Sequence, residues 1–243
     1  MNLTVDIGNT SIKAGLFDNG EVVDTFRLDR DAEKGILSII EANPSIDAAI
    51  SVATGEAAAI EEMLRGKIKK YIRFDHSIGT PVRNLYTTPH TLGYDRLAAA
   101  VGAHTIYSSS YVMVVDFGTA ITIDIVTPAG EFLGGNISPG ATMRLRALKY
   151  YTSSLPLIEF NDMTEGELVG NSTASAICSG VINGVIFEIE GYIERFSKIY
   201  SPLKVIFTGG EAIFFAKRLK STIFAANDLI LFGLNRILRY NES

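Results

Sequence analysis

The chain is poor in cysteine, tryptophan and histidine, having one, none and three of these residues among 243. With Cys178 alone, no disulfide can form within the chain, which is typical of a protein from a reducing compartment. Cys178 lies among small residues, so we expect a packed thiol rather than a nucleophile. The histidines His76, His90 and His104 are scattered in the sequence and show no metal-ligand spacing.

The chain also lacks an excess of positive charge and long apolar runs. Its 22 Lys and Arg residues stand against 27 Asp and Glu residues, a net charge of −5, so nucleic acid is a poor default partner. The sequence starts with an alternating strand at Asn2–Ile7 in place of a signal peptide, and no segment approaches 18 uninterrupted apolar residues. We therefore expect a soluble, cytoplasmic protein that does not act at a membrane.

Three common phosphate-binding motifs are missing. Gly15 and Gly20 have the spacing of Walker glycines, but Glu21 follows where a lysine must stand, and no G-x-G-x-x-G occurs. Asp116-Phe117-Gly118 matches the D-F-G of protein kinases, but no H-R-D loop precedes it, so we interpret the match as chance. P-loop, Rossmann and protein-kinase chemistry are thereby disfavoured.

What the chain does have is one hairpin pattern that occurs twice, at Val5–Glu21 and Val115–Glu131, with a constant offset of 110 residues. Each copy has an apolar strand ending in Asp-x-Gly, a second strand, and a glycine turn. Asn19-Gly20 is a strong hairpin signal because both central residues of a type I′ turn need positive φ. Some aligned positions differ, such as Ala14 and Asp124. The identical positions in the two copies are Val5/Val115, Asp6/Asp116, Gly8/Gly118, Gly20/Gly130 and Glu21/Glu131.

Each hairpin is followed by alternating helix and strand patterns, which predicts an α/β fold of two similar lobes, 1–108 and 109–243, with a ligand cleft between them. The join is expected near 108–110. In the first lobe we predict helices at Asp31–Asn43, Glu56–Arg65 and Asp95–Tyr107, and strands at Ala48–Ala53 and Tyr71–Phe74. In the second we predict a helix after Gly140, a long helix at Ala174–Ile199, a strand at Val205–Phe207, and helices at Ala212–Lys220 and Leu229–Tyr240.

The first hairpin turn offers the chemistry of a phosphate loop. Glycine in a turn lets backbone N–H groups approach a polyphosphate, because no Cβ holds it off. Asn9, Thr10 and Ser11 add side-chain donors, and Lys13 adds a positive charge. Asp6, at the end of the strand, can hold Mg²⁺ or its waters.

The second turn repeats this arrangement with Asp116, beside which lie Thr119 and Thr122. A single D-x-G is more often structural, since aspartate in a turn usually accepts backbone N–H bonds. Two copies at equivalent places favour function. Two carboxylates and a cation around a phosphate chain suit phosphoryl transfer, which depends on positioning and charge neutralisation.

These hairpins resemble those of the acetate and sugar kinase, heat-shock chaperone and actin superfamily, whose lobes are ribonuclease-H-like. Within it the chain is similar to type III pantothenate kinases. The similarity runs in order through almost the whole chain. Its segments are Asp6–Lys13, Tyr86 with Pro89 and Leu92, Gly93–Arg96, Asp116–Ala120, Gly134–Gly140, Gly170–Thr173 and Thr208–Gly210.

The resemblance implies ATP-dependent phosphorylation of pantothenate, the first step towards coenzyme A, by a homodimer. It implies that Asp95 is the catalytic base and that Asp116 holds a monovalent cation, K⁺ or NH₄⁺. Asp6 would serve Mg-ATP, and Thr173 would bind substrate at or near the dimer interface. ATP would be bound by Asp6, Ile7, Gly8, Asn9, Thr10, Ser11, Ile12, Lys13 and Thr119. The pantothenate site would comprise Tyr86, Gly93, Tyr94, Asp95, Arg96 and Thr173.

Alternatives remain at the level of residues and of the whole chain. Asp95 taken alone is better interpreted as an N-terminal helix cap, since aspartate is favourable in a first turn. Arg96 can serve the carboxylate of pantothenate. Another small-molecule kinase of the superfamily, a catalytically silent regulatory relative, and a ribonuclease-H-type nuclease with two metals are the rival functions.

Overall fold

The first sheet is built from the first hairpin and the strands that follow it. The computed structural model describes residues 1–9, 11–28, 31–162, 167–219 and 223–242. The strand order is β3-β2-β1-β4-β5, with the hairpin strands antiparallel and β4 and β5 parallel to β1. The strands are β1 (Asn2–Ile7), β2 (Ile12–Asp18), β3 (Glu21–Leu28), β4 (Ala48–Ala53) and β5 (Lys70–Arg73).

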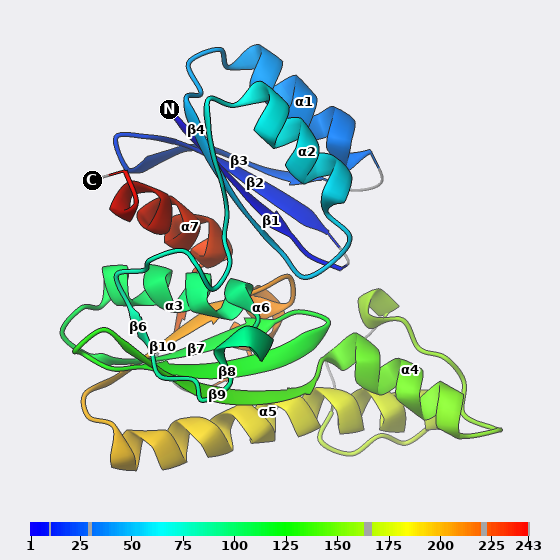
Figure 1. Cartoon of the computed structure of the whole chain (residues 1–243). Coiled ribbons are helices and arrows are strands. Elements are labelled where there is room, and N and C mark those ends of the chain that lie inside the picture. The colour runs from blue at the N-terminus through cyan, green and yellow to red at the C-terminus, as the bar shows by residue number, and fades with distance from the viewer. Residues whose placement is uncertain (10, 29–30, 163–166, 220–222, 243) are drawn as a thin grey trace. The chain divides into compact units, whose positions relative to one another are not determined.

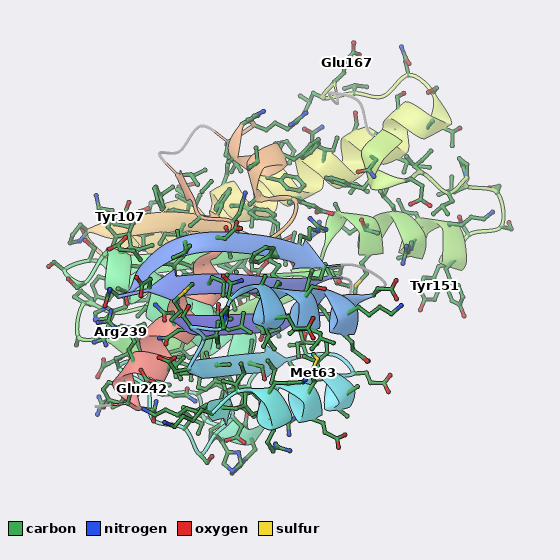
Figure 2. The ribbon with its side chains drawn as sticks, turned by 90° about the horizontal axis from the view of Figure 1, so that it is seen from above. Met63, Tyr107, Tyr151, Glu167, Arg239 and Glu242 are labelled. Carbon is green, nitrogen blue, oxygen red and sulfur yellow. The ribbon has the colours of Figure 1, made fainter. Side chains whose placement is uncertain are left out.

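The turn between β2 and β3 has the backbone conformation that the sequence predicts. Asn19 and Gly20 both have positive φ, 50° and 96°. A side chain at Gly20 would meet the guanidinium of Arg239, which is labelled in Figure 2 at the end of the C-terminal helix. The glycine therefore satisfies both the turn and a close packing contact.

Helices cover both faces of this first sheet (Figure 1). One face carries α1 (Ala32–Ala42) and α2 (Ala58–Lys67), and the other carries α7 (Leu229–Tyr240), which packs on β1 and β4. The helix α3 (Tyr94–Ile106) packs against α7. Gly102 and Gly233 let the two helix backbones touch, because a side chain at either would collide with the facing helix. These helices confirm the predicted ones to within a few residues.

Two apolar cores follow from this arrangement. One, under α1 and α2, is built on Leu3, Val5 and Ile7 of β1. The other, under α3 and α7, is built on Ala48, Ile50 and Val52 of β4. Alternate residues of the strands thus point to opposite faces, and both faces are buried.

The second sheet repeats the topology of the first. Its order is β11-β10-β7-β8-β9-β6, so β9-β8-β7-β10-β11 corresponds strand by strand to β3-β2-β1-β4-β5. The predicted duplication is therefore confirmed in strand order. The strands are β6 (Arg83–Asn84), β7 (Tyr111–Phe117), β8 (Ala120–Val126), β9 (Glu131–Pro139), β10 (Leu203–Thr208) and β11 (Phe224–Ala225).

The strands β6 and β11 were not predicted from the sequence. Each has two residues, too few to show the alternation by which a strand is recognised. β6 pairs in parallel with β9, Arg83 facing Glu131 across the register. Its existence depends on a partner strand about 50 residues away in the chain, which no local pattern reveals.

The remaining helices are α4 (Ala141–Tyr151), α5 (Thr173–Ile199), α6 (Ala212–Ala216) and the short 3₁₀ turns Pro89–Thr91 and Phe160–Asp162. α6 is shorter than the predicted Ala212–Lys220, and Lys220 lies outside the described residues. α5 begins with a capping box between Ser172 and Ser175. Cys178 on α5 is a buried free thiol, as predicted.

Among the described residues, α5 is the one helix whose length and composition would allow it to cross a membrane. Of its most apolar 18-residue window, 44% is buried within the protein. A core helix meets the same length and composition criteria. Its buried face includes Ile177, Val181, Ile182, Val185 and Ile189.

The chain forms two compact units, 1–112 with 124–134 and 228–243, and 113–123 with 135–227. The helix α7 belongs to the first unit because it packs on β1 and α3. The predicted lobes 1–108 and 109–243 and the cleft between them stay predictions.

Candidate active site

The first hairpin turn joins β1 to β2 and is closed by a backbone bond from Gly8 N–H to the carbonyl of Ser11, 3.2 Å long. Glycine is required here because a Cβ at Gly8 would lie 2.9 Å from that carbonyl oxygen. A Cβ at Gly55 would lie 3.3 Å from Asn9 Oδ1, so the loop after β4 also approaches the turn closely. The tight backbone suits a loop that receives a phosphate.

Two of the predicted phosphate-binding side chains face each other at the base of this turn. Asp6 on β1 and Lys13 on β2 are register partners across the antiparallel pair. A carboxylate and an ammonium group at such positions lie on the same face of the sheet. The structure brings together Asp6, Ile7, Gly8, Asn9, Ser11, Ile12 and Lys13 in one turn. Thr10 lies outside the described residues.

Asp95 is the second residue of α3, and the N-cap is Gly93. The interpretation of Asp95 as the helix cap therefore does not hold at this position. Its Oδ1 accepts a 2.8 Å bond from Arg96 N–H. A Cβ at Gly93 would lie 2.5 Å from this oxygen, so the absence of a side chain there makes room for the carboxylate.

Burial sets the acidity of Asp95. It raises the pKa of this carboxyl above its usual range, and the backbone N–H and the charge of Arg96, which act in the opposite direction, do not cancel it. A carboxylate with a raised pKa is a better proton acceptor near neutral pH. This is the electrostatic environment that a general base requires.

Arg96, in contrast, is already engaged. It is 7% exposed, and its Nε and Nη2 donate to the two carboxylate oxygens of Asp124 at 3.0 and 2.5 Å. Burial opposes the charge of Arg96, but the bonds to Asp124, together with Tyr86, raise its pKa. The predicted contact of Arg96 with pantothenate stays a prediction, and at least two of its five donors are used within the protein.

Asp124 was not among the site residues inferred from the sequence. Its signal was present, since it is a charged residue inside the apolar strand Ile121–Val126 and aligns with Ala14 in the first hairpin. It is 2% exposed, and a buried charge requires a partner. The identity of that partner could not be deduced because Arg96 lies 28 residues earlier.

Aromatic rings surround this pair. The ring centroid of Tyr86 lies 5.6 Å from Arg96 Cζ and 6.3 Å from the ring of Phe132. Tyr94 packs edge-on against Phe74 and donates its hydroxyl to Pro89 O at 3.2 Å. The predicted substrate residues of the first unit all lie in the first turn of α3 or in the segment before it.

The second hairpin turn lies in the second unit and is packed more tightly than the first. Gly140 N–H donates to Thr119 O at 3.2 Å, and a Cβ at Gly140 would lie 2.5 Å from the carbonyl oxygens of both Gly118 and Thr119. Gly209 has a φ of 93°, and a side chain there would collide with Asp116 Oδ1. Asp116 and Thr119 are thereby brought to one small cluster at the ends of β7 and β10.

Glu211 belongs to this cluster and was also missed from the sequence. Its N–H donates to Phe117 O at 3.3 Å, and Thr142 Oγ1 donates to its Oε1 at 3.4 Å. Its Oε2 is buried without a hydrogen-bond partner among the described residues. Burial raises the pKa of this carboxyl to about 7. The signal was an acidic residue directly after Gly209-Gly210.

The residue Thr173 is the first of α5 and is exposed, following the N-cap Ser172. The second unit therefore contains three of the predicted site residues, namely Asp116, Thr119 and Thr173.

The carboxylate of Asp6 suits Mg²⁺ that is bound together with a nucleotide. Within the described ranges, no three Asp, Glu, His or Cys side chains form a group that could hold a metal ion. Mg²⁺ with ATP needs only one or two carboxylates, because phosphates and waters supply the other ligands. Asp6, at the end of a strand beside a tight turn, matches that requirement.

Comparison with known proteins identifies the family of these motifs. A family model described as type III pantothenate kinase matches residues 2–195. A type III pantothenate kinase of Phocaeicola vulgatus is 41% identical over 100% of this chain and 99% of its own, and one of Cytophaga hutchinsonii is 40% identical over 99% and 100%.

Solved structures show the same fold. A protein described as a Baf family transcriptional activator from Campylobacter jejuni has a TM-score of 0.64 and 25% identity, covering 99% of this chain and 98% of its own. A ROK family glucokinase from Streptomyces griseus, solved with glucose and AMPPNP, has a TM-score of 0.55 and 14% identity, covering 98% and 99%. The latter likeness concerns the fold alone.

Proposed function

Because the chain belongs to the type III pantothenate kinase family, its reaction is the ATP-dependent phosphorylation of pantothenate in coenzyme A biosynthesis, and we propose that Asp95 accepts the proton of the attacking hydroxyl. The product is 4′-phosphopantothenate. The observation that carries this role is the half-buried Asp95 carboxylate, oriented by Arg96 N–H and given room by Gly93. Phosphoryl transfer has a loose transition state, so a well-aligned carboxylate of modest basicity is sufficient.

ATP is assigned to the two hairpin turns. Asp6, Ile7, Gly8, Asn9, Thr10, Ser11, Ile12 and Lys13 would bind its phosphates from the first, and Thr119 would contact it from the second. The tight backbone at Gly8 and the cross-strand pair of Asp6 and Lys13 support this assignment. Mg²⁺, when bound with ATP near Asp6, neutralises phosphate charge and polarises the transferred group.

A monovalent cation, K⁺ or NH₄⁺, is assigned to Asp116. The support is the position of its Oδ1 against the backbone at Gly209, where a Cβ would lie 2.4 Å from this oxygen. Asp116 and Asp6 thus have different roles although the repeat makes them equivalent. Replacing K⁺ by Na⁺ in the assay would test the role of Asp116 without changing the role of Asp6 with Mg-ATP.

Pantothenate is assigned to Tyr86, Gly93, Tyr94, Asp95, Arg96 and Thr173. The rings of Tyr86 and Tyr94 supply apolar walls, and the phenol groups supply hydrogen-bonding partners at their edges. The Tyr94 hydroxyl is protonated at neutral pH and can act as a donor, and burial raises the pKa of this phenol further.

A homodimer in the cytoplasm is the proposed state of the protein. Large apolar side chains remain exposed on α4 and α5, namely Met143, Tyr150, Tyr151, Phe187 and Ile199. Tyr150 and Tyr151 are 80% and 81% exposed, which is unusual for a surface without a partner. Sedimentation velocity measures the state directly, and a monomer at micromolar concentration would contradict it.

One assay tests the function. Purified protein is mixed with pantothenate, Mg-ATP and either K⁺ or Na⁺, and ADP and phosphopantothenate are followed. We expect turnover on pantothenate that depends on the cation. Absence of turnover in every salt, or equal turnover on unrelated hydroxy acids, would contradict the proposal.

The Asp95→Asn variant tests the role of the base. We expect kcat to fall about 10²- to 10⁴-fold, the range for a positioned general base, with ATP binding retained. Isothermal titration with a non-hydrolysable ATP analogue provides the control. A variant that keeps most of its activity would make Asp95 a structural residue.

A further inference from the structure

At one of the buried, aligned positions at which the two hairpins differ, the first has Ala14 and the second has the ionisable Asp124. Both side chains are in the core of the first unit, at 0% and 2% exposure. A methyl group needs no partner in such a place, whereas an ionised carboxylate needs a counter-charge and hydrogen bonds. The replacement therefore has a cost that the pair with Arg96 must offset.

The pair of Asp124 and Arg96 is two-pronged, with both oxygens of the carboxylate bonded. Such fork geometry fixes the orientation of both groups as well as holding them together. Buried ion pairs contribute little net stability compared with apolar side chains of the same size. Stability alone is thus a weak reason for an aspartate at this place.

The location of Arg96 suggests a better reason. It follows Asp95 directly, and its own backbone N–H donates to Asp95 Oδ1. Fixing the guanidinium on β8 fixes the first turn of α3, and with it the N–H that orients the carboxylate. The same guanidinium lies over the ring of Tyr86, another predicted substrate residue.

The charges near Asp95 give Asp124 a second effect. Arg96 is the charged side chain that acts on the Asp95 carboxyl among the described residues, and it lowers the pKa of that carboxyl. Asp124 from β8 and Tyr86 from the segment after β6 both interact with Arg96. By neutralising Arg96, Asp124 limits the attraction that would otherwise make Asp95 a weaker base.

We propose that Asp124 is a positioning residue of the phosphoryl transfer, which clamps and neutralises Arg96 so that Asp95 keeps its alignment and its basicity. This inference rests on the proposed role of Asp95. Asp124 itself touches neither substrate nor nucleotide in this scheme. The step that it supports is the transfer of the hydroxyl proton to Asp95 Oδ as the bond from oxygen to phosphorus forms and ADP leaves.

The test is Asp124→Asn, which keeps the shape of the side chain and removes its charge. We expect kcat to fall about 10- to 100-fold, as for partners that orient a functional ligand, with the KM for ATP unchanged. The acidic limb of the pH profile of kcat/KM should move to lower pH, because an uncompensated Arg96 favours the charged form of Asp95. ¹³C NMR titration of the Asp95 carboxyl reads the same shift without turnover.

Glu61→Gln is the matched control. Glu61 is also a buried carboxylate, 8% exposed, paired with an arginine of the first unit, Arg73, at 3.0 Å. It lies on α2 and has no proposed part in the site. We expect this variant to lose stability but to keep kcat and the position of the acidic limb.

The outcomes separate the proposals. An Asp124→Asn variant whose Asp95 titration and pH limb match those of the wild type would overturn the inference, even with kcat reduced. A wild type that is inactive on pantothenate would overturn the proposed function, while the NMR shift would still decide the role of Asp124. If Asp124→Asn does not fold, Asp124→Glu decides: it retains the charge and must keep the wild-type titration of Asp95.

Discussion

The two hairpin turns have the same backbone plan but different surroundings. At the first, Gly8 and Gly55 leave room around Asn9, and the side chains of Asp6 and Lys13 are register partners. At the second, the corresponding partner of Asp116 is Ile123 by the 110-residue offset, so the basic residue is absent. The duplication preserved strand order while the ionisable groups diverged.

The second turn is also more enclosed. Gly140 and Gly209 press against Gly118, Thr119 and Asp116, and the carboxyl of Glu211 is buried beside them. In the proposed scheme the second turn, with its acidic groups, would hold a small cation, and the first, with Lys13 across from Asp6, would hold phosphate oxygens. The difference indicates that equivalent positions in a repeat do not imply equivalent chemistry.

The largest expected effect comes from exchanging the two leading carboxylates for amides. Asp6→Asn should lower kcat about 100-fold or more and raise the Mg²⁺ concentration needed for half-maximal rate. Asp116→Asn should abolish the stimulation by K⁺ and leave the Mg²⁺ requirement unchanged. Initial rates measured at varied concentrations of Mg²⁺ and K⁺ report both requirements. Identical responses of the two variants would show that Asp6 and Asp116 have the same role.

A smaller effect is expected from the glycine beside Asp116. Gly209→Ala should cost about 1–3 kcal/mol of stability, since alanine is strained at positive φ, and should also weaken cation activation by displacing Asp116. Gly130→Ala is the control, because Gly130 has a φ of 71° in the same hairpin but a side chain there would first meet His104. It should lose stability and keep the K⁺ dependence. Urea unfolding measures the loss of stability in both variants, and the rate as a function of K⁺ concentration shows which of them has lost cation activation.

The smallest effect concerns Glu211. Its folded pKa of about 7 lies above the ordinary 4.5, so the native state holds the proton more tightly than the unfolded chain. The free energy of unfolding should therefore fall as pH rises from about 4.5 to about 7, by roughly 1–2 kcal/mol once solvent screening is allowed for.

Glu211→Gln removes this titration and should make the protein more stable than the wild type at pH 8, but not at pH 4.5. Chemical unfolding across this pH range, without nucleotide or added K⁺, provides the measurement. A constant difference between the two proteins at every pH would show that the carboxyl ionises normally.

Several features were predictable from short stretches of sequence. The turn at Asn19-Gly20, the helices α1 and α7, and the strand β4 depend on backbone preferences and apolar periodicity within about ten residues. The repeat of Asp-x-Gly indicated two similar sheets, and their common strand order confirms it. The resemblance of the motifs identified the family correctly.

Other features depended on residues that are distant in the chain. The turns and most helices were predictable from local sequence. Asp6 and Asp116 were selected as reactive carboxylates from the repeat and Asp95 from the family resemblance, and their roles stay predictions. The pairing of Asp124 with Arg96 and the burial of Glu211 became evident in the folded chain, because burial and pairing arise where separate elements meet. A local pattern records the conformation of its own backbone, whereas the charge state of a side chain depends on which neighbours the fold brings to it.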